Sequence, residues 1–133
     1  MRIIIDTNVL ISAIIYPASI PGKAVTKVLN NHKLVLCSFI IEELHRILSR
    51  KFKNKTEYLE EFLRKVTFEL VDTPIVIDLT RYPAIRDKRD LPILVSAITA
   101  EVDMIITGDK DFLVLGIEKP IVLTPAEFMD VIS

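Results

Sequence analysis

Short apolar runs recur along the chain, and a polar residue or glycine follows each of them. Runs of this length that end in turn-forming residues are typical of buried strands. They predict five strands, at Arg2–Ile5, Lys33–Cys37, Phe68–Val71, Met104–Thr107 and Pro120–Leu123.

The segments between the strands carry apolar residues at helical spacing. They predict helices at Val9–Ile15, Lys23–Asn31, Ser38–Phe52, Thr56–Val66, Leu91–Val102, Lys110–Leu115 and after Thr124, with a turn at Tyr16–Gly22 and one helical turn near Val76–Leu79. Ser38, Thr56 and Thr124 are expected N-caps, and Pro92 and Pro125 fit the first turn of a helix.

Alternation of strands and helices favours one α/β domain over residues 1–133, with a parallel sheet covered on both faces. Composition narrows the class further. Half of the residues are apolar, which excludes a disordered chain, and the single cysteine excludes a disulfide framework. No apolar stretch is long enough to span a membrane or act as a signal peptide, so we expect a cytoplasmic protein.

Acidic residues stand where the predicted strands end. Asp6 follows the first strand, and Asp109 and Asp111 follow the fourth; Asp90 opens the helix that leads into the fourth strand, and Glu43 lies one turn inside the helix after the second. Ligands of open parallel sheets bind beyond the carboxyl ends of the strands. If the first and fourth strands are neighbours, Asp6 and Asp109 face one crevice.

Each acid taken alone has a simpler explanation. An Asp between a strand and a helix usually caps the helix. Glu43 falls on the flank of the apolar helix stripe and Glu42 falls opposite it, so Glu43 is the candidate; its alternative is a surface ion pair with Arg46 or Arg50.

Taken together, four carboxylates in one crevice repel one another unless a cation or protons neutralise them. Ligands that are all oxygen favour Mg²⁺ or Mn²⁺ over zinc. The sequence therefore predicts a site for one of these two ions at Asp6, Glu43, Asp90 and Asp109.

Four segments in this order resemble the motifs of PIN-domain nucleases. They are Ile-Ile-Ile-Asp6-Thr7-Asn8-Val-Leu, Ser38-Phe-Ile-Ile-Glu-Glu43-Leu-His-Arg-Ile-Leu, Asp87-Lys-Arg-Asp90-Leu-Pro-Ile-Leu-Val-Ser-Ala and Met-Ile-Ile-Thr107-Gly108-Asp109-Lys-Asp111-Phe-Leu. Each motif alone is weak, but together they span nearly the whole chain. Within this family the chain resembles the prokaryotic group of toxins from toxin–antitoxin pairs, which is related to VapC-type ribonucleases.

This resemblance implies a three-layer α/β/α sandwich around the parallel sheet, and a metal-dependent ribonuclease that cuts single-stranded RNA. It implies that Asp6, Glu43, Asp90 and Asp109 are catalytic and hold the metal. Asp111 would be an accessory acid, Thr7 and Thr107 would orient water or carboxylates, and Asn8 would brace the loop of Asp6. A cognate antitoxin and a second copy of the chain are the expected protein partners.

The charge distribution is compatible with an RNA substrate. Setting the four site acids aside moves the formal net charge from −1 to +3. We expect Arg46, Arg50, Arg86 and Arg89 to contact phosphates, which supply most of the nonspecific affinity for nucleic acid. The alternative is that these arginines form a solvated face.

Other functions of similar folds fit the sequence less well. A phosphoacceptor receiver domain needs a phosphorylatable Asp at the end of the third strand and a Lys at the end of the fifth; Asp72 is a poor candidate for the first, and the fifth strand runs into Thr124-Pro125. A haloacid-dehalogenase-type phosphatase needs Asp-x-Asp in place of Asp6-Thr7-Asn8. Metal-dependent DNA cleavage and a non-catalytic interaction module of the same fold remain open alternatives.

Overall fold

A five-stranded parallel sheet forms the centre of the computed structural model, which describes residues 1–132. The strand order is β3-β2-β1-β4-β5, and every neighbouring pair is parallel. The predicted sheet is confirmed, and the boundaries of the strands differ from the predicted ones by at most one residue. The strands are β1 (Arg2–Ile5), β2 (Lys33–Cys37), β3 (Phe68–Val71), β4 (Met104–Ile106) and β5 (Ile121–Leu123).

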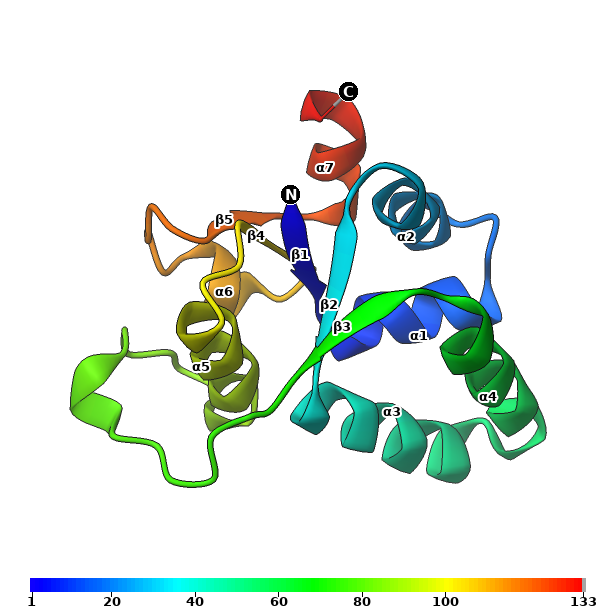
Figure 1. Cartoon of the computed structure of the whole chain (residues 1–133), viewed down its shortest axis with the longest axis horizontal. Helices are drawn as coiled ribbons and strands as arrows, with labels where there is room; N and C mark the ends of the chain where they lie inside the picture. The colour runs from blue at the N-terminus through cyan, green and yellow to red at the C-terminus, as the bar shows by residue number, and fades with distance from the viewer. Residues whose placement is uncertain (133) are drawn as a thin grey trace.

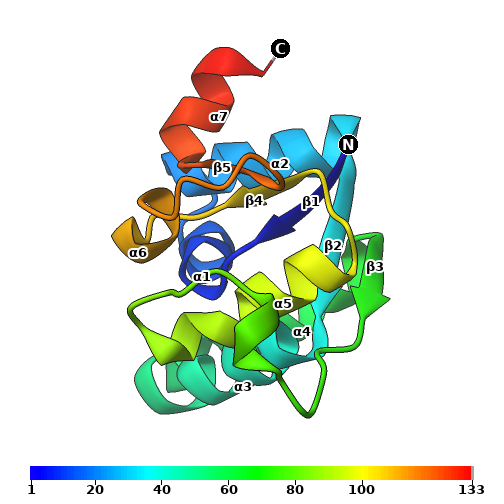
Figure 2. The ribbon, with the colours of Figure 1, turned by 90° about the vertical axis from the view of Figure 1, so that its left-hand side faces the viewer.

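Helices cover both faces of this sheet, as Figure 1 shows: α1, α2 and α4 lie on one side and α5 on the other. Helix α3 runs past the carboxyl ends of the strands, and α7 lies at the opposite end of the molecule (Figure 2). The expected three-layer α/β/α sandwich is therefore confirmed. The helices are α1 (Thr7–Ile15), α2 (Ile20–Asn31), α3 (Ser38–Lys51), α4 (Thr56–Lys65), α5 (Leu91–Thr99), α6 (Lys110–Leu113) and α7 (Pro125–Val131).

Helix α2 begins three residues before the predicted position, inside the segment expected to be a turn. Ser19 caps it by accepting a hydrogen bond from the backbone N–H of Gly22. Pro21 is tolerated because a first-turn residue needs no intrahelical N–H donor. A Cβ at Gly22 would lie 2.2 Å from the carbonyl oxygen of Pro17, so only glycine permits this close turn.

Two of the three expected N-caps are wrong by one residue. Ser38 and Thr56 are the first residues of α3 and α4, and the residue before each is the cap. The Ser38 hydroxyl instead accepts a hydrogen bond from the backbone N–H of Thr73, which ties α3 to the chain beyond β3. Thr124 does cap α7, in a capping box with Glu127.

The long connection from β3 to α5 and the end of α5 also differ from the prediction. Two 3-10 turns, at Leu79–Arg81 and Lys88–Asp90, replace the single turn expected near Val76–Leu79. Helix α5 stops at Thr99, before the predicted Val102, because Glu101 adopts a positive φ of 53° that ends a helix.

Apolar side chains of the sheet and the inner helix faces make up the core. Strand β1 buries Ile3, Ile4 and Ile5 completely, and Cys37 is a buried free thiol, as expected for a small core residue. No single helix within residues 1–132 has the length and apolarity to span a membrane, and only the α1–α2 pair, bent by 100°, passes that test together.

The sheet order creates a crevice at one place. From β1 the chain moves outward to β2 and β3, then returns to β4 on the other side of β1. The strand order thus reverses at β1, where ligands of such sheets bind beyond the carboxyl ends. Because β1 and β4 are neighbours, Asp6 and Asp109 follow adjacent strands, and the conditional prediction about them is confirmed.

Candidate functional site

Asp6 lies at the floor of this crevice, between β1 and α1. Its backbone N–H donates to the carbonyl of Ile106 at 3.0 Å, which extends the β1–β4 ladder by one residue. Its side chain is 6% exposed, and Oδ1 caps α1 by accepting from the N–H of Val9 at 3.0 Å. Burial, the largest cause, and the nearby charges of Asp109 and Glu43 raise the pKa of this carboxyl.

Thr107 connects the two acids that follow β1 and β4. Its hydroxyl is fully buried, donates to Oδ2 of Asp6, and accepts from the backbone N–H of Asp109 at 3.0 Å. Asp109 in turn accepts from the N–H of Asp111 through Oδ1 at 2.8 Å. Thr107 therefore holds the carboxylate of Asp6 and the backbone of Asp109, and the N–H of Asp111 holds the carboxylate of Asp109.

Glu43 reaches the same crevice from the middle of α3. Its Oε1 accepts from the hydroxyl of Thr7 at 2.7 Å, and its Oε2 pairs with Arg46 at 3.1 Å. Glu43 thus lines the crevice and also forms the alternative ion pair with Arg46. Glu42 is exposed and Glu43 half-buried, so the helix periodicity separated the two glutamates correctly.

Asp90 stands at the start of α5 and makes no cap hydrogen bond. Its Oδ2 is buried and has no hydrogen-bond partner within the described residues. Burial, together with the adjacent carboxyl of Asp109 and the charges of Asp87 and Asp6, raises its pKa to about 7. A buried oxygen without a partner is costly, and it calls for a proton or a cation that the described residues do not supply.

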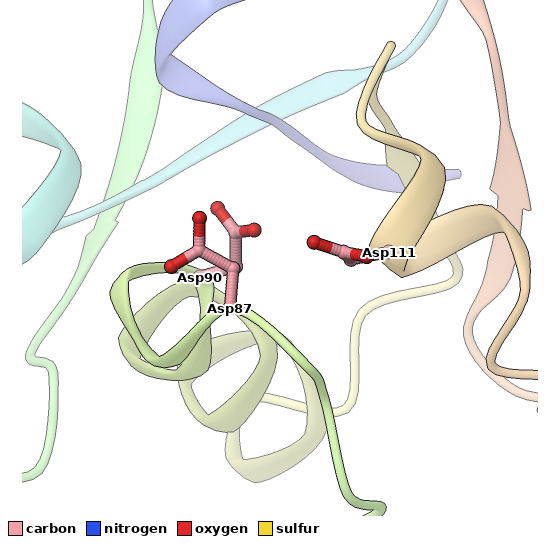
Figure 3. A group of neighbouring side chains, drawn as sticks. All are labelled: Asp87, Asp90 and Asp111. Carbon is pink, nitrogen blue, oxygen red and sulfur yellow. The ribbon is translucent and has the colours of Figure 1, made fainter.

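Asp87 is a site residue that the sequence interpretation did not single out. One carboxylate oxygen each from Asp87, Asp90 and Asp111 lie within 4.8 Å of one another, and Figure 3 shows Asp111, on α6, pointing across a gap toward the other two. The signal was present, because Asp87 and Asp90 are three residues apart in the third motif.

Arginines hold the two outer acids of this group. Arg86 binds Asp111 through two hydrogen bonds of 2.9 and 3.0 Å, and Arg89 binds Asp87 through two of 3.1 and 2.8 Å. The pKa of Asp87 is lowered to about 2, mainly by its hydrogen bond to Arg89. Both arginines thus neutralise acids beside the crevice.

The candidate site is an open cleft of about 350 Å³ with an acidic floor. Asn8 lines it, but its side chain is exposed and makes no hydrogen bond within residues 1–132, so it does not brace the loop of Asp6 as expected. Asp111 and Arg86 lie outside the lining. The charged and polar lining residues are Asp6, Thr7, Asn8, Glu43, Arg46, Arg50, Lys51, Asp87, Arg89, Asp90 and Asp109.

These donors fit a hard divalent cation. The charged side chains that could bind a metal in the cleft are all carboxylates, and neither His nor Cys lines it. Carboxylate oxygens are the ligands that Mg²⁺ and Mn²⁺ prefer. The unpartnered Oδ2 of Asp90 is the observation that favours a cation here over a network of structural ion pairs.

Replacing Thr107 by valine is expected to destabilise the protein by about 1–3 kcal/mol, because Asp6 Oδ2 and the N–H of Asp109 would each lose a buried partner. Urea denaturation measures this change. Thr107→Ser keeps the hydroxyl, so it should recover most of the loss; an equal loss in both variants would mean that the methyl group matters and the hydrogen bonds do not.

Comparison with known proteins agrees with this geometry. The family model described as "PIN domain" matches residues 2–111. The uncharacterized protein MJ1680 of Methanocaldococcus jannaschii is 30% identical over 141 residues, which cover 98% of this chain and 90% of that protein. A chain in the crystal structure of VapBC2 from Rickettsia felis, bound to a DNA fragment from their promoter, has the same fold, with a TM-score of 0.68, 20% identity and coverage of 92% of this chain and 97% of that one. The resemblance seen in the four motifs is confirmed, and the chain belongs to the PIN domain family.

Proposed function

We propose that this chain is an endoribonuclease that requires Mg²⁺ or Mn²⁺ and hydrolyses phosphodiester bonds of single-stranded RNA. One observation carries the proposal: Asp6, Glu43, Asp90 and Asp109 converge in one cleft, and a buried oxygen of Asp90 has no partner among the described residues. If Asp90 had a purely structural role, its buried oxygen would be expected to have a hydrogen-bond partner.

The proposed chemistry divides among the residues of the cleft. Asp6, Glu43, Asp90 and Asp109 would hold the ion, which when bound lowers the pKa of water and neutralises charge on the phosphate. Thr7 and Thr107 hold the carboxylates of Glu43 and Asp6 in place by hydrogen bonds.

The carboxylate of Asp6 or Asp90 would accept the proton of the attacking water. Attack by water rather than by the ribose 2′-hydroxyl leaves a 5′-phosphate and a 3′-hydroxyl. Products that end in a cyclic phosphate would contradict this mechanism.

The proposal includes a biological context. We infer that the chain is the toxin of a toxin–antitoxin pair, with a cognate antitoxin and a second copy of itself as partners. The support is the shared fold with a chain of VapBC2 from Rickettsia felis. Arg46, Arg50, Arg86 and Arg89, which lie in or beside the cleft, are the proposed contacts to RNA phosphates.

Cleavage of a mixed-sequence single-stranded RNA tests the proposal. We expect cutting in Mg²⁺ or Mn²⁺ and none in EDTA, with product ends mapped by labelling. The Asp6→Asn variant, purified in the same way, controls for contaminating nucleases, and single-stranded DNA of the same sequence tests the DNA alternative. Cutting in EDTA, or equal cutting by the variant, would overturn the proposal.

A further inference from the structure

The cleft carries opposite charges at its two ends. Its acidic floor is formed by the loops after β1 and β4, and its other wall is one face of α3. The α3 residues that line it stand at spacings of three, four, seven and eight from the first, which is one face of a helix. They are Glu43, Arg46, Ile47, Arg50 and Lys51.

The basic residues of this region differ in whether an acid already holds them. Arg46 pairs with Glu43, Arg89 with Asp87, and Arg86 with Asp111. Arg50 and Lys51 are exposed and form no ion pair with any residue between 1 and 132. Of the lining cations, these two are the ones whose charge is available to a ligand.

The helix dipole alone does not explain this placement. Cations in the last turn of a helix are favourable because they meet its partial negative charge. The dipole favours them on every side of the helix, whereas Arg50 and Lys51 both face the cleft. Two neighbouring cations do not: Lys53 does not line it, and Lys55 lies over the ring of Tyr58 at 4.9 Å, outside it.

We propose that Arg50 and Lys51 form a phosphate-binding subsite for the backbone of a single-stranded RNA, away from the bond that is cut. This inference rests on the proposed function, because the acidic floor is taken as the place of cleavage. Seven residues of helix separate Glu43 from Arg50, which is about 10 Å. The subsite would therefore contact a phosphate other than the one at the cut.

Several properties of the cleft fit a single strand. Its volume of about 350 Å³ is within the range of about 300–1,000 Å³ that is usual for ligand sites. Ile47 lies on α3 between the site acid Glu43 and Arg50 and offers an apolar surface to a base or sugar. A single-stranded RNA can contact the acidic floor and the basic face of α3 at the same time.

Anisotropy of a labelled 12-nucleotide single-stranded RNA, measured in Mg²⁺ over a salt series, tests the subsite. The Arg50→Gln/Lys51→Gln double variant should bind about tenfold more weakly at low salt. The slope of log affinity against log salt should fall by about 1.4, because each lost phosphate contact of a single strand accounts for about 0.7. In cleavage assays KM should rise and kcat should stay unchanged, since these contacts are the same in the ground and transition states.

The matched control is the Lys53→Gln/Arg64→Gln double variant, which removes the same two charge types from exposed positions outside the cleft. It should keep the slope of the wild type. Equal slopes for the two double variants would overturn the subsite, even if the wild type cuts RNA. A lower slope for the cleft variant alone, with no cutting by the wild type, would support the subsite and overturn the proposed function.

Discussion

The Asp90→Asn variant is expected to unfold at a higher temperature than the wild type when both are metal-free above pH 7, and to lose at least about a hundredfold in RNA cleavage. Such opposite effects mark a residue that is kept for function at a cost in stability. The expected loss of cleavage follows from removing one of the carboxylates that would hold the metal and also a candidate proton acceptor.

The gain in stability follows from the raised pKa of Asp90. In the folded protein its pKa is about 7, whereas an Asp in an unfolded chain titrates near 3.9. Between about pH 4 and pH 7 the unfolded state therefore binds fewer protons than the folded state, so stability falls as pH rises. Asparagine stays neutral, so the variant should lack this part of the fall.

Thermal unfolding in EDTA from pH 4 to pH 8 measures the effect. The two melting curves should nearly coincide at pH 4 and separate as pH rises, with the variant higher. Asp130→Asn, an exposed change on α7 outside the cleft, should follow the wild type. Adding Mn²⁺ should raise the Tm of the wild type more than that of Asp90→Asn, because a ligand of the folded state stabilises it. Parallel profiles for Asp90→Asn and wild type would contradict the assignment.

The hydrophobic pattern of the sequence was sufficient to locate the strands of the sheet, for a physical reason. Both faces of a central strand of a parallel sheet are buried, so such strands appear as short continuous apolar runs, and β1 and β2, which are buried beyond their first residues, were located to the residue. The presence of a residue type that commonly caps helices was not sufficient to locate the first residue of each helix. Ser38 and Thr56 have side chains suited to capping, but tertiary contacts decide whether a hydroxyl meets its own helix or, as Ser38 does, a backbone N–H from another segment.

The candidate site was predictable in part. Asp6, Glu43, Asp90 and Asp109 were chosen by their place at strand ends and helix starts, and the structure brings all four to one cleft. Asp87 was missed, although it stands three residues before Asp90 in the third motif, because it lies in a long polar connection where acids are common.

The sequence could not predict which charged residues around the site form ion pairs. Whether an arginine is free or held depends on contacts across the fold, such as that of Arg86 with Asp111, 25 residues away. The sequence treated Arg46, Arg50, Arg86 and Arg89 alike, whereas the structure leaves only Arg50 among these four without an ion pair to a described residue.

Glu43→Gln is expected to weaken Mn²⁺ binding by at least about 10–100-fold, since losing even a partner of a metal ligand typically costs that much. Cleavage should fall at least as far. The variant should still fold, because the amide oxygen can accept from Thr7 as Oε1 does now, and the side chain is only 17% exposed and nearly the same shape.

The neighbouring Glu42→Gln variant is a matched control for charge, residue type and helix. Glu42 points to solvent from the same turn of α3, so it should bind Mn²⁺ and cleave RNA like the wild type. Titration calorimetry and single-turnover cleavage measure both variants. Equal behaviour of the two would mean that Glu43 serves only its ion pair with Arg46, and the metal would then have to be held by the acids of β1, β4 and α5 alone. A large difference between two adjacent glutamates would arise only if the ligand approaches from the cleft side of α3, because both variants change the net charge of the protein equally.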